Sequence, residues 1–299
     1  MKLLAERARA LASTRTFFAS RGYLEVETPV AVPSPGLDVH LDAFALSPGD
    51  RFLATSPEYQ MKRLVAEHPR IFQLTRAFRA GERGARHNPE FTILEFYRHG
   101  DVDGVMRDTE QLVARLTGGH VVVDGRTIDL TPPFPRLTVR EAFARHAGIA
   151  PEETLRLAHE DEDTFFEKLA FTIEPALAAL AHGTFLVDWP TPMASLARRK
   201  EDDPDVAERF ELYVAGIELC NGFGELTDPA EQRARLVADQ EERRRRKKPV
   251  YPIDERFLAA LARGLPPCAG NAIGFDRLVA LAHGSVEIAP VLAFPDDEL

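Results

Sequence analysis

The stretch that most constrains this chain is residues 72–97, which read FQLTRAFRAGERGARHNPEFTILEFY. Its two flanks are rich in aromatic and β-branched residues, while its middle contains glycine, asparagine, proline and several charges. Two such runs around a polar segment are typical of a long antiparallel hairpin. Because side chains on one face of a strand recur every second residue, Arg79 near the tip and Glu95 and Tyr97 on the return strand are expected to line one concave surface.

The loop of this hairpin, residues 81–89, is dense in charged and hydrogen-bonding groups. It carries Glu82, Arg83, Arg86, His87 and Asn88. Cationic and donor groups at this density suit a ligand that bears phosphates. A solvated hairpin tip without any ligand has the same composition, so the loop alone leaves both interpretations open.

A second hairpin is predicted over residues 210–226, FELYVAGIELCNGFGEL, with its turn near residues 215–216. Its return strand carries Glu218 and Asn221, and Glu225 follows directly. Apolar side chains alternate with these polar ones, so the polar side faces either a pocket or solvent. We favour the pocket.

Near the end of the chain, a strand over residues 270–273 is predicted to run into a helix over residues 275–282. Gly270 and Gly274 permit close approach of the backbone, either to a stacked adenine or to a packed helix. The chain contains no GxxxxGK[ST] loop and no dinucleotide-binding glycine pattern.

Three segments together resemble one enzyme family. The order of residues 72–97 resembles motif 2 of class II aminoacyl-tRNA synthetases, and HNPEFT is close to their lysyl-specific branch. RGYLEVETP, at residues 21–29, is similar to motif 1, and GNAIGFDRLVAL, at residues 270–281, is similar to motif 3 with its closing Arg277. The resemblance implies an α+β catalytic core, in which helices flank an antiparallel β-sheet.

The resemblance also implies ATP and Mg²⁺ as cofactors and assigns a role to each matching residue. Arg79 and Arg277 are the implied catalytic residues, with Arg79 on the α-phosphate and the substrate carboxylate and Arg277 on the γ-phosphate. Glu218 and Glu225 are the implied acidic groups around Mg²⁺. The other implied ATP-binding residues are Gly81, Glu82, His87, Asn88, Glu218, Leu219 and Gly274, where the chain departs from the family's usual FRNE after Arg79. The implied substrate-binding residues are Ser56, Pro57, Glu58, Tyr97, Asn221 and Glu225.

The segment SPEY, from residue 56, also fits a helix start on local grounds. Ser56 is a favourable N-cap, Pro57 suits the first helical position, and Glu58 falls in the first turn.

Lysine's distal ammonium needs a paired carboxylate once it leaves water, so we expect Glu225 and Tyr97 to hold it.

Charge and cysteine content exclude several classes of protein. The net charge of −10 disfavours nonspecific binding of nucleic acid, so stable tRNA binding is not expected. The basic run RRRRKK, at residues 243–248, is either a solvated helix end or a docking patch for an acidic partner. Cys220 and Cys268 are too few for a disulfide framework or a zinc site, and we expect both to be buried.

The N-terminal residues MKLLAERARALAS contain charges that interrupt any signal-peptide core, and no later apolar run approaches a membrane span. We therefore expect a cytoplasmic protein with no membrane partner. The helix over residues 5–20 and the strand over residues 23–27 resemble the family's dimer interface, which implies a homodimer. Packing inside one subunit would produce the same pattern.

We expect a single catalytic domain, residues 1–299, with a helical insertion around residues 132–182. Because the first motif starts at residue 21, an N-terminal anticodon-binding OB-fold is not expected. These features and the SPEY segment resemble a group of lysyl-tRNA synthetase paralogues that transfer lysine or β-lysine to a lysine side chain of elongation factor P. The alternatives are a truncated lysyl-tRNA synthetase acting on tRNA or a small acceptor, and a catalytically silent regulatory paralogue, which retention of both arginines disfavours.

Overall fold

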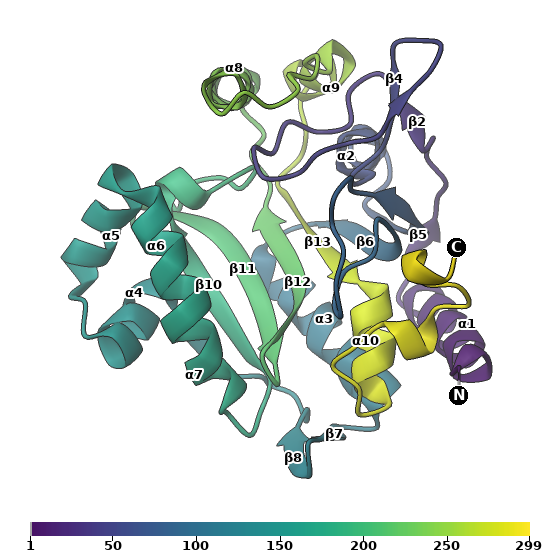
Figure 1. Ribbon diagram of the computed structural model, residues 1–299. Helices are drawn as coiled ribbons and strands as arrows, with labels where there is room; N and C mark the ends of the chain where they lie inside the picture. The colour runs from purple at the N-terminus through teal and green to yellow at the C-terminus, as the bar shows by residue number, and fades with distance from the viewer. Residues whose placement is uncertain (1) are drawn as a thin grey trace.

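The computed structural model describes residues 2–299. Its centre is an eight-stranded sheet with helices on both faces and at one end (Figure 1). In spatial order the strands are β1 (Leu24–Glu25), β5 (Arg70–Phe78), β6 (Glu90–His99), β13 (Cys268–Gly274), β12 (Ile217–Gly224), β11 (Val206–Val214), β10 (Thr184–Pro190) and β9 (Arg136–Thr138). The expected α+β class is therefore confirmed.

The inner pairings of the sheet are antiparallel, as expected, but the two outer strands pair in parallel. The expected strand over residues 23–27 is shorter, because only β1 pairs with its neighbour β5. The first predicted hairpin is confirmed as β5 and β6, with Phe72 opposite Phe96. The second is confirmed as β11 and β12, which turn through Ala215 and Gly216, both at positive φ.

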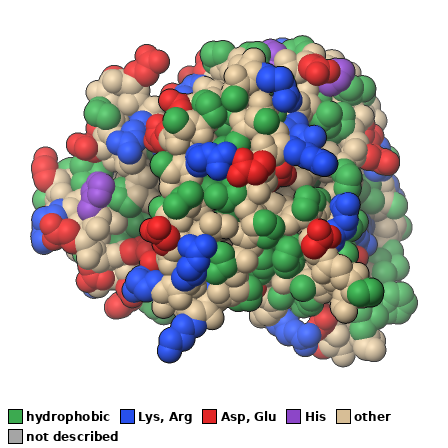
Figure 2. Space-filling model, turned by 90° about the horizontal axis from the view of Figure 1, so that it is seen from above, with side chains coloured by type: hydrophobic (Ala, Val, Ile, Leu, Met, Phe, Trp, Pro, Cys, Tyr) green, Lys and Arg blue, Asp and Glu red, His purple; other side chains and the backbone are tan. Residues whose placement is uncertain are grey.

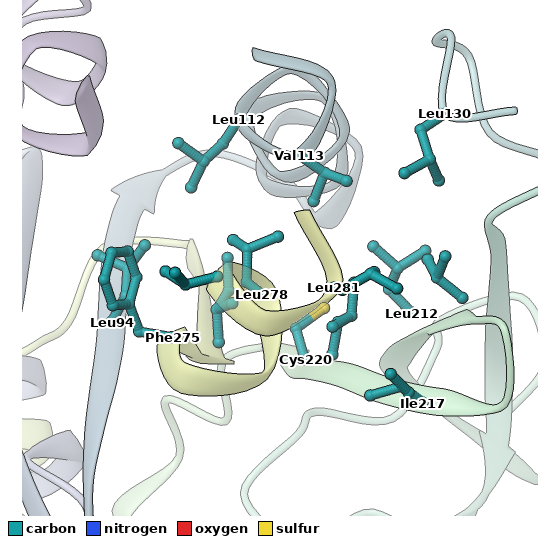
Figure 3. Close-up of a cluster of buried hydrophobic side chains, with 14 of the residues drawn as sticks. Leu94, Leu112, Val113, Leu130, Leu212, Ile217, Cys220, Phe275, Leu278 and Leu281 are labelled. Atoms are coloured by element: carbon teal, nitrogen blue, oxygen red, sulfur yellow. The ribbon is translucent and has the colours of Figure 1, made fainter. Parts of the chain in front are cut away.

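Three helices pack on one face of the sheet: α1 (Leu4–Ser20), α3 (Val102–Thr117) and α10 (Phe275–Ala282). Figure 3 shows α10 between α3 and the sheet. Its labelled side chains are Leu278, Leu281 and Phe275 on α10, Leu112 and Val113 on α3, Leu94, Leu212, Ile217 and Cys220 on the strands, and Leu130. Because α10 follows β13 without a gap, this core fixes the position of the side chains at its first turn.

Helices α2 (Glu58–Val65), α8 (Pro229–Arg245) and α9 (Glu255–Ala262) share a second cluster of buried side chains. Helix α2 begins one residue later than expected, after Pro57 as its N-cap, while the Ser56 hydroxyl accepts a hydrogen bond from the Glu58 amide. In α8, the Asp228 carboxylate accepts hydrogen bonds from the first-turn amides and caps the helix. Both helices therefore start beside the same end of the sheet.

The insertion lies at the end of the sheet opposite α1 (Figure 1). It contains α4 (Val139–Ala142), α5 (Pro151–Glu160), α6 (Glu162–Lys168) and α7 (Glu174–Ala178), with π-helical turns at Phe143–Ala147 and Leu169–Ile173. Thr138 caps α4 in a reciprocal capping box with Glu141. The expectation of helices alone was wrong, because β9 extends the main sheet from within this segment.

The remaining elements are small. They are β2 (Ala31–Val32), β3 (Ala45–Leu46) and β4 (Arg51–Leu53) in one sheet, the hairpin of β7 (His120–Val123) and β8 (Arg126–Asp129), and 3₁₀ turns at Thr191–Met193, Ala289–Val291 and Asp296–Glu298. Cys220 and Cys268 are both buried with free thiols, as expected. Within residues 2–299, none of the helices combines the length and the apolar composition that crossing a membrane requires.

Candidate active site

Two adjoining cavities are lined by residues of β6, β12 and β13. The first, called here the carboxylate cavity, has a volume of about 250 Å³ and includes Glu58 and Glu95 in its wall. The second, the arginine cavity, has a volume of about 180 Å³ and includes Arg86 and Arg277. Both are lined by Asp38, Leu41, Arg79, Ile93, Asn221 and Ala272. A ligand in one cavity would therefore meet a ligand in the other across this shared wall.

The residues predicted from motifs divide between these cavities. The arginine cavity is lined by Arg79, Glu82, His87, Asn88, Glu218, Leu219, Gly274 and Arg277. The carboxylate cavity is lined by Ser56, Glu58 and Asn221. Gly81, Pro57, Tyr97 and Glu225 line neither cavity.

Arg277 is held by its neighbours at the mouth of the arginine cavity. Its Nη1 donates to the Glu218 carbonyl oxygen at 2.8 Å, and its Nε donates to the Arg86 carbonyl oxygen at 3.3 Å. Its Nη2 lies 2.7 Å from Nε2 of His87. Burial and the charge of Arg277 lower the pKa of His87, so this ring stays neutral and accepts from the guanidinium. The fork is therefore fixed before any anion binds.

Arg79 lies on the shared wall, just beyond the end of β5. Its Nε donates to the Thr55 carbonyl oxygen at 3.4 Å, and its Nη1 lies 3.6 Å from the Glu82 carboxylate. Its guanidinium stacks on the ring of Phe91, 4.9 Å from the ring centre. Phe91 also lines the arginine cavity and was not expected from the motif pattern, although it is the aromatic residue of HNPEFT.

Glu95 is the buried acid of the carboxylate cavity. Its two oxygens accept hydrogen bonds from the Ser56 hydroxyl at 2.5 Å and from the Tyr97 hydroxyl at 3.0 Å. Burial raises the pKa of Glu95 to about 7, with the charge of Glu58 adding to the shift and both hydrogen bonds opposing it. Tyr97 therefore does not line the cavity, and its hydroxyl orients the Glu95 carboxylate through this hydrogen bond.

Glu225 is fully buried and already has a cationic partner. The Lys62 ammonium, on α2, lies 2.5 Å from the Glu225 carboxylate and 2.7 Å from the Glu58 carboxylate. Burial alone would lower the pKa of Lys62, but the two carboxylates outweigh it and raise that pKa, so the ammonium stays charged. The expectation that Glu225 and Tyr97 meet a ligand directly is thus not met.

Glu218 and Glu225 are too far apart to hold one metal ion, which corrects the expectation from the sequence. They stand seven positions apart on and just beyond the extended strand β12, a separation of roughly 20 Å. Carboxylates that share one Mg²⁺ lie about 2 Å from the ion, so they cannot be more than about 4 Å apart. Glu218 remains at the arginine cavity.

Glu211, on β11, is an acid of this region that the motif pattern did not indicate. Burial raises its pKa to about 7, while Arg209 opposes the shift and the charge of Glu218 adds to it. Arg209 pairs with Glu211 at 2.6 Å and stacks on Trp189, 4.2 Å from the ring centre. In the pairing of β11 with β12, Glu211 lies opposite Asn221 and Glu218 lies opposite Tyr213, so the two acids are two positions apart along one hairpin.

The insertion contributes to the site, although no residue of it was expected to. Glu162 and Phe166, both on α6, line the carboxylate cavity. Glu174 receives a long hydrogen bond of 3.5 Å from the Tyr213 hydroxyl, and burial followed by the charge of Glu218 raises its pKa. The insertion therefore forms part of the cavity wall.

The two motif 3 glycines have different roles. A Cβ at Gly270 would lie 2.3 Å from the Tyr97 ring and 2.7 Å from the Glu225 carboxylate, so its close approach serves packing between strands. A Cβ at Gly274 would meet only the side chain of Arg277, at an ordinary 3.4 Å. Of the two glycines, only Gly274 lines the arginine cavity.

The basic run at residues 243–248 is largely neutralised inside the chain. Arg243 is fully buried, Arg245 and Arg246 both pair with Glu242, and Lys248 lies 3.2 Å from Asp42. On the face that includes α8 and α9, Figure 2 shows blue and red side chains interspersed. Arg244, Arg245 and Lys247 are nevertheless exposed, so the structure leaves a smaller basic surface than the six cations of the run indicate.

Two comparisons relate this chain to known proteins. The family model described as tRNA synthetases class II (D, K and N) matches residues 1–298. Proteins named "Elongation factor P--(R)-beta-lysine ligase" from Salmonella dublin and from Salmonella paratyphi B are each 42% identical to this chain over 322 aligned residues. Each alignment covers 98% of this chain and 95% of the relative.

Proposed function

Because this chain belongs to the family of class II tRNA synthetases of the D, K and N type, we propose that it is a ligase that activates lysine or β-lysine with ATP and transfers it to a lysine side chain of elongation factor P. The observation that carries the proposal is the pairing of two cavities through Arg79. One cavity is rich in carboxylates, and the other is rich in groups that bind phosphates.

The charge of the carboxylate cavity supports a cationic amino acid. The charge of Glu58 raises the pKa of both Glu95 and Glu225, and Lys62 is the cation that pairs with Glu58 and Glu225. With all three acids ionised, the cluster lacks two positive charges, which the two amines of lysine or β-lysine would supply. Glu95 and Glu58 are the acids we assign to these amines, and Glu225 acts through Lys62.

The arginine cavity supports ATP as the second substrate. Arg79 would meet the α-phosphate and the amino-acid carboxylate together, and Arg277 would meet the γ-phosphate. Phe91, with one face on Arg79, offers an aromatic surface for the adenine. His87, Asn88, Glu82, Leu219 and Gly274 line the remaining wall.

A magnesium ion fits beside Glu218, and we propose Glu211 as its second acid in place of Glu225. The charge of Glu218 raises the pKa of Glu211 and of Glu174, and a divalent cation would relieve that repulsion. When bound, the ion would neutralise charge on the phosphates of ATP. Glu218 and Glu211 would keep it on the β11–β12 side of the cavity.

The residues present suit a reaction that is catalysed by positioning the two substrates and by neutralising charge on the phosphates. The substrate carboxylate is already ionised at neutral pH, so no base is needed when it attacks the α-phosphorus and pyrophosphate leaves. The two arginines stabilise the charge that develops on the phosphates. In the second step the acceptor amine attacks the mixed anhydride and AMP leaves.

We propose that the protein works as a homodimer through α1 and β1. Leu4 and Leu24 on these elements are large apolar side chains that are 45% and 48% exposed. Because β1 is the outer strand of the sheet, its free edge would pair or pack against a second copy.

The test mixes the protein with ATP and with labelled lysine or (R)-β-lysine, and offers elongation factor P and total tRNA in separate reactions. We expect label on elongation factor P and release of AMP, with the Arg277→Ala variant as the blank. Pyrophosphate exchange across a panel of amino acids identifies the activated substrate. Label on tRNA and none on elongation factor P would overturn the proposal.

A further inference from the structure

The loop of residues 38–42 is a wall common to both cavities. Asp38 and Leu41 line the carboxylate cavity and the arginine cavity, and His40 lines the first. The loop belongs to no helix or strand, so regular backbone pairing does not hold it in place. Its far end contacts the catalytic region directly, because the Ala80 amide donates to the Asp42 carbonyl oxygen at 2.7 Å.

A single buried arginine on α8 binds this loop. Nη1 of Arg243 donates to the carbonyl oxygens of Asp38 at 2.6 Å and Leu41 at 2.8 Å. Nη2 donates to the Asp42 carboxylate at 2.7 Å, and Nε donates to the Pro249 carbonyl oxygen at 2.6 Å. The side chain of Arg243 is 0% exposed, whereas that of Asp42 is 34% exposed, so the guanidinium end of each bond is shielded from water.

The surroundings of Arg243 hold the guanidinium at one angle. Its central carbon lies 4.4 Å from the centre of the Tyr251 ring, and the hydroxyl of the same ring accepts a hydrogen bond from the Ala43 amide at 2.7 Å. Lys248 adds a second, more exposed contact to Asp42 at 3.2 Å. Arg243 and Tyr251 therefore clamp both ends of one short loop.

We propose that Arg243 is a positioning residue that fixes the wall shared by the amino acid and ATP, so that its loss weakens the binding of both substrates together. The proposal rests on the proposed function for the identity of the substrates. The planar fork reaches two carbonyl oxygens and a carboxylate at once, which an ammonium cannot do. A lysine at this position would keep the charge and lose the geometry.

The variants are Arg243→Lys and Arg243→Gln, with Arg244→Gln as the matched control at the exposed neighbouring position. Because a buried arginine is also a stability risk, Asp42→Asn serves as a second, milder variant that removes the carboxylate contact from the loop side. Hydrogen bonds to charged groups contribute about 1.5–3 kcal/mol, so we expect both dissociation constants to rise by about tenfold or more in the Arg243 variants. Asp42→Asn is expected to show a smaller rise in both.

Three readouts separate positioning from a merely structural role. Calorimetry gives the dissociation constants for ATP and for lysine or (R)-β-lysine at a temperature where thermal melts show each variant folded. Hydrogen exchange reports opening of residues 38–42, and pyrophosphate exchange divides the effect between KM and kcat. We expect faster exchange in the loop, a higher KM for both substrates, and no rescue by Arg243→Lys.

Folded variants that bind both ligands as the wild type does would overturn the proposal, even if their melting temperatures fall. A change in the affinity for one substrate alone would also overturn it. If wild-type protein binds ATP but none of the amino acids, the proposed function fails. The dissociation constants for ATP and the hydrogen exchange of residues 38–42 then still decide the role of Arg243.

Discussion

Arg277 differs from an ordinary surface arginine in that three neighbours hold its fork before any ligand arrives. We expect Arg277→Ala to lower the rate of pyrophosphate exchange by roughly 10²–10³, because a preorganised donor to developing phosphate charge is lost. Arg277→Lys is expected to recover little, since an ammonium cannot reproduce two-pronged contact. The measurement is pyrophosphate exchange at saturating ATP and amino acid.

Arg83→Ala is the matched control for this prediction. Arg83 lies in the same hairpin loop, is 71% exposed, and pairs with Asp296 outside both cavities. Exposed ion pairs contribute about 0–1 kcal/mol to stability, so the variant is expected to fold and react like the wild type. Near wild-type exchange by Arg277→Ala would contradict the role given to that residue.

Glu95 predicts how amino-acid binding depends on pH. Because its pKa is raised to about 7, it is protonated in the free protein at pH 6 and ionised at pH 8. A cationic substrate binds the ionised form, so the affinity for lysine or β-lysine, measured by calorimetry without ATP, is expected to rise between pH 6 and pH 8. Glu95→Gln should bind weakly and without this dependence. A wild-type affinity that falls with pH over the same range would refute the assignment.

The raised pKa of Glu95 also makes the free energy of unfolding depend on pH. Its pKa in the folded chain lies above the ordinary value of 4.5, so the folded state holds a proton that the unfolded chain has released. The contribution of Glu95 to the free energy of unfolding therefore falls as pH rises from about 4.5 to about 7, and is constant above that. Binding of a cation to the ionised form offsets this loss.

At the scale of whole elements, the Lys62–Glu225 ion pair joins α2 to the end of β12. Glu225→Gln is expected to destabilise the fold by about 3–5 kcal/mol, because it removes one partner of a buried pair. The double variant Lys62→Met/Glu225→Gln should recover part of the loss, since it also removes the buried ammonium, which Glu225→Gln alone leaves with Glu58 as its one carboxylate partner. Chemical denaturation measures both, and equal unfolding midpoints for wild type and Glu225→Gln would contradict a structural role for this pair.

Which elements could be predicted follows from how local their determinants are. The β5–β6 and β11–β12 hairpins depend on side chains within a few positions of their turns, and both were predicted correctly. Strand β9 was missed because its three residues become a strand only by pairing with β10. The place of Glu225 was misjudged for a similar reason. Its partner Lys62 lies in another part of the sequence, and no local pattern indicates which acid is already paired.

The same limit applies to the basic run on α8. Six cations in a row indicate a charged surface by composition, yet Arg243 turns inward because carbonyl oxygens of a distant loop surround it. Motif order identified about half of the residues that line the arginine cavity, among them Arg79 and Arg277. Phe91, in the same cavity, became apparent through its stacking on Arg79, and Glu211, which lines neither cavity, through its pairing with Arg209. Sequence patterns thus indicate which residues can bind phosphates more reliably than they indicate which distant residues those side chains contact.

For the molecule as a whole, we expect two copies to associate, and sedimentation should give twice the chain's 33.3 kDa. Leu24→Arg would place a charge in the proposed interface, where an unpaired ion is costly to desolvate. This variant is expected to weaken the dimer at least tenfold. Val122→Arg, at a 52% exposed apolar position on the separate β7–β8 hairpin, is the control. A wild-type protein that sediments as a monomer at micromolar concentration would contradict the dimer.

Trp189 is the single tryptophan of the chain, and it is buried under the guanidinium of Arg209. Arg209 in turn holds Glu211, the acid that we place beside the magnesium ion. The tryptophan fluorescence of the chain therefore originates from one indole, which contacts Arg209 in the wall of the carboxylate cavity. Trp189 is therefore an intrinsic fluorophore, and its emission can follow a titration of the unlabelled protein with magnesium and ATP.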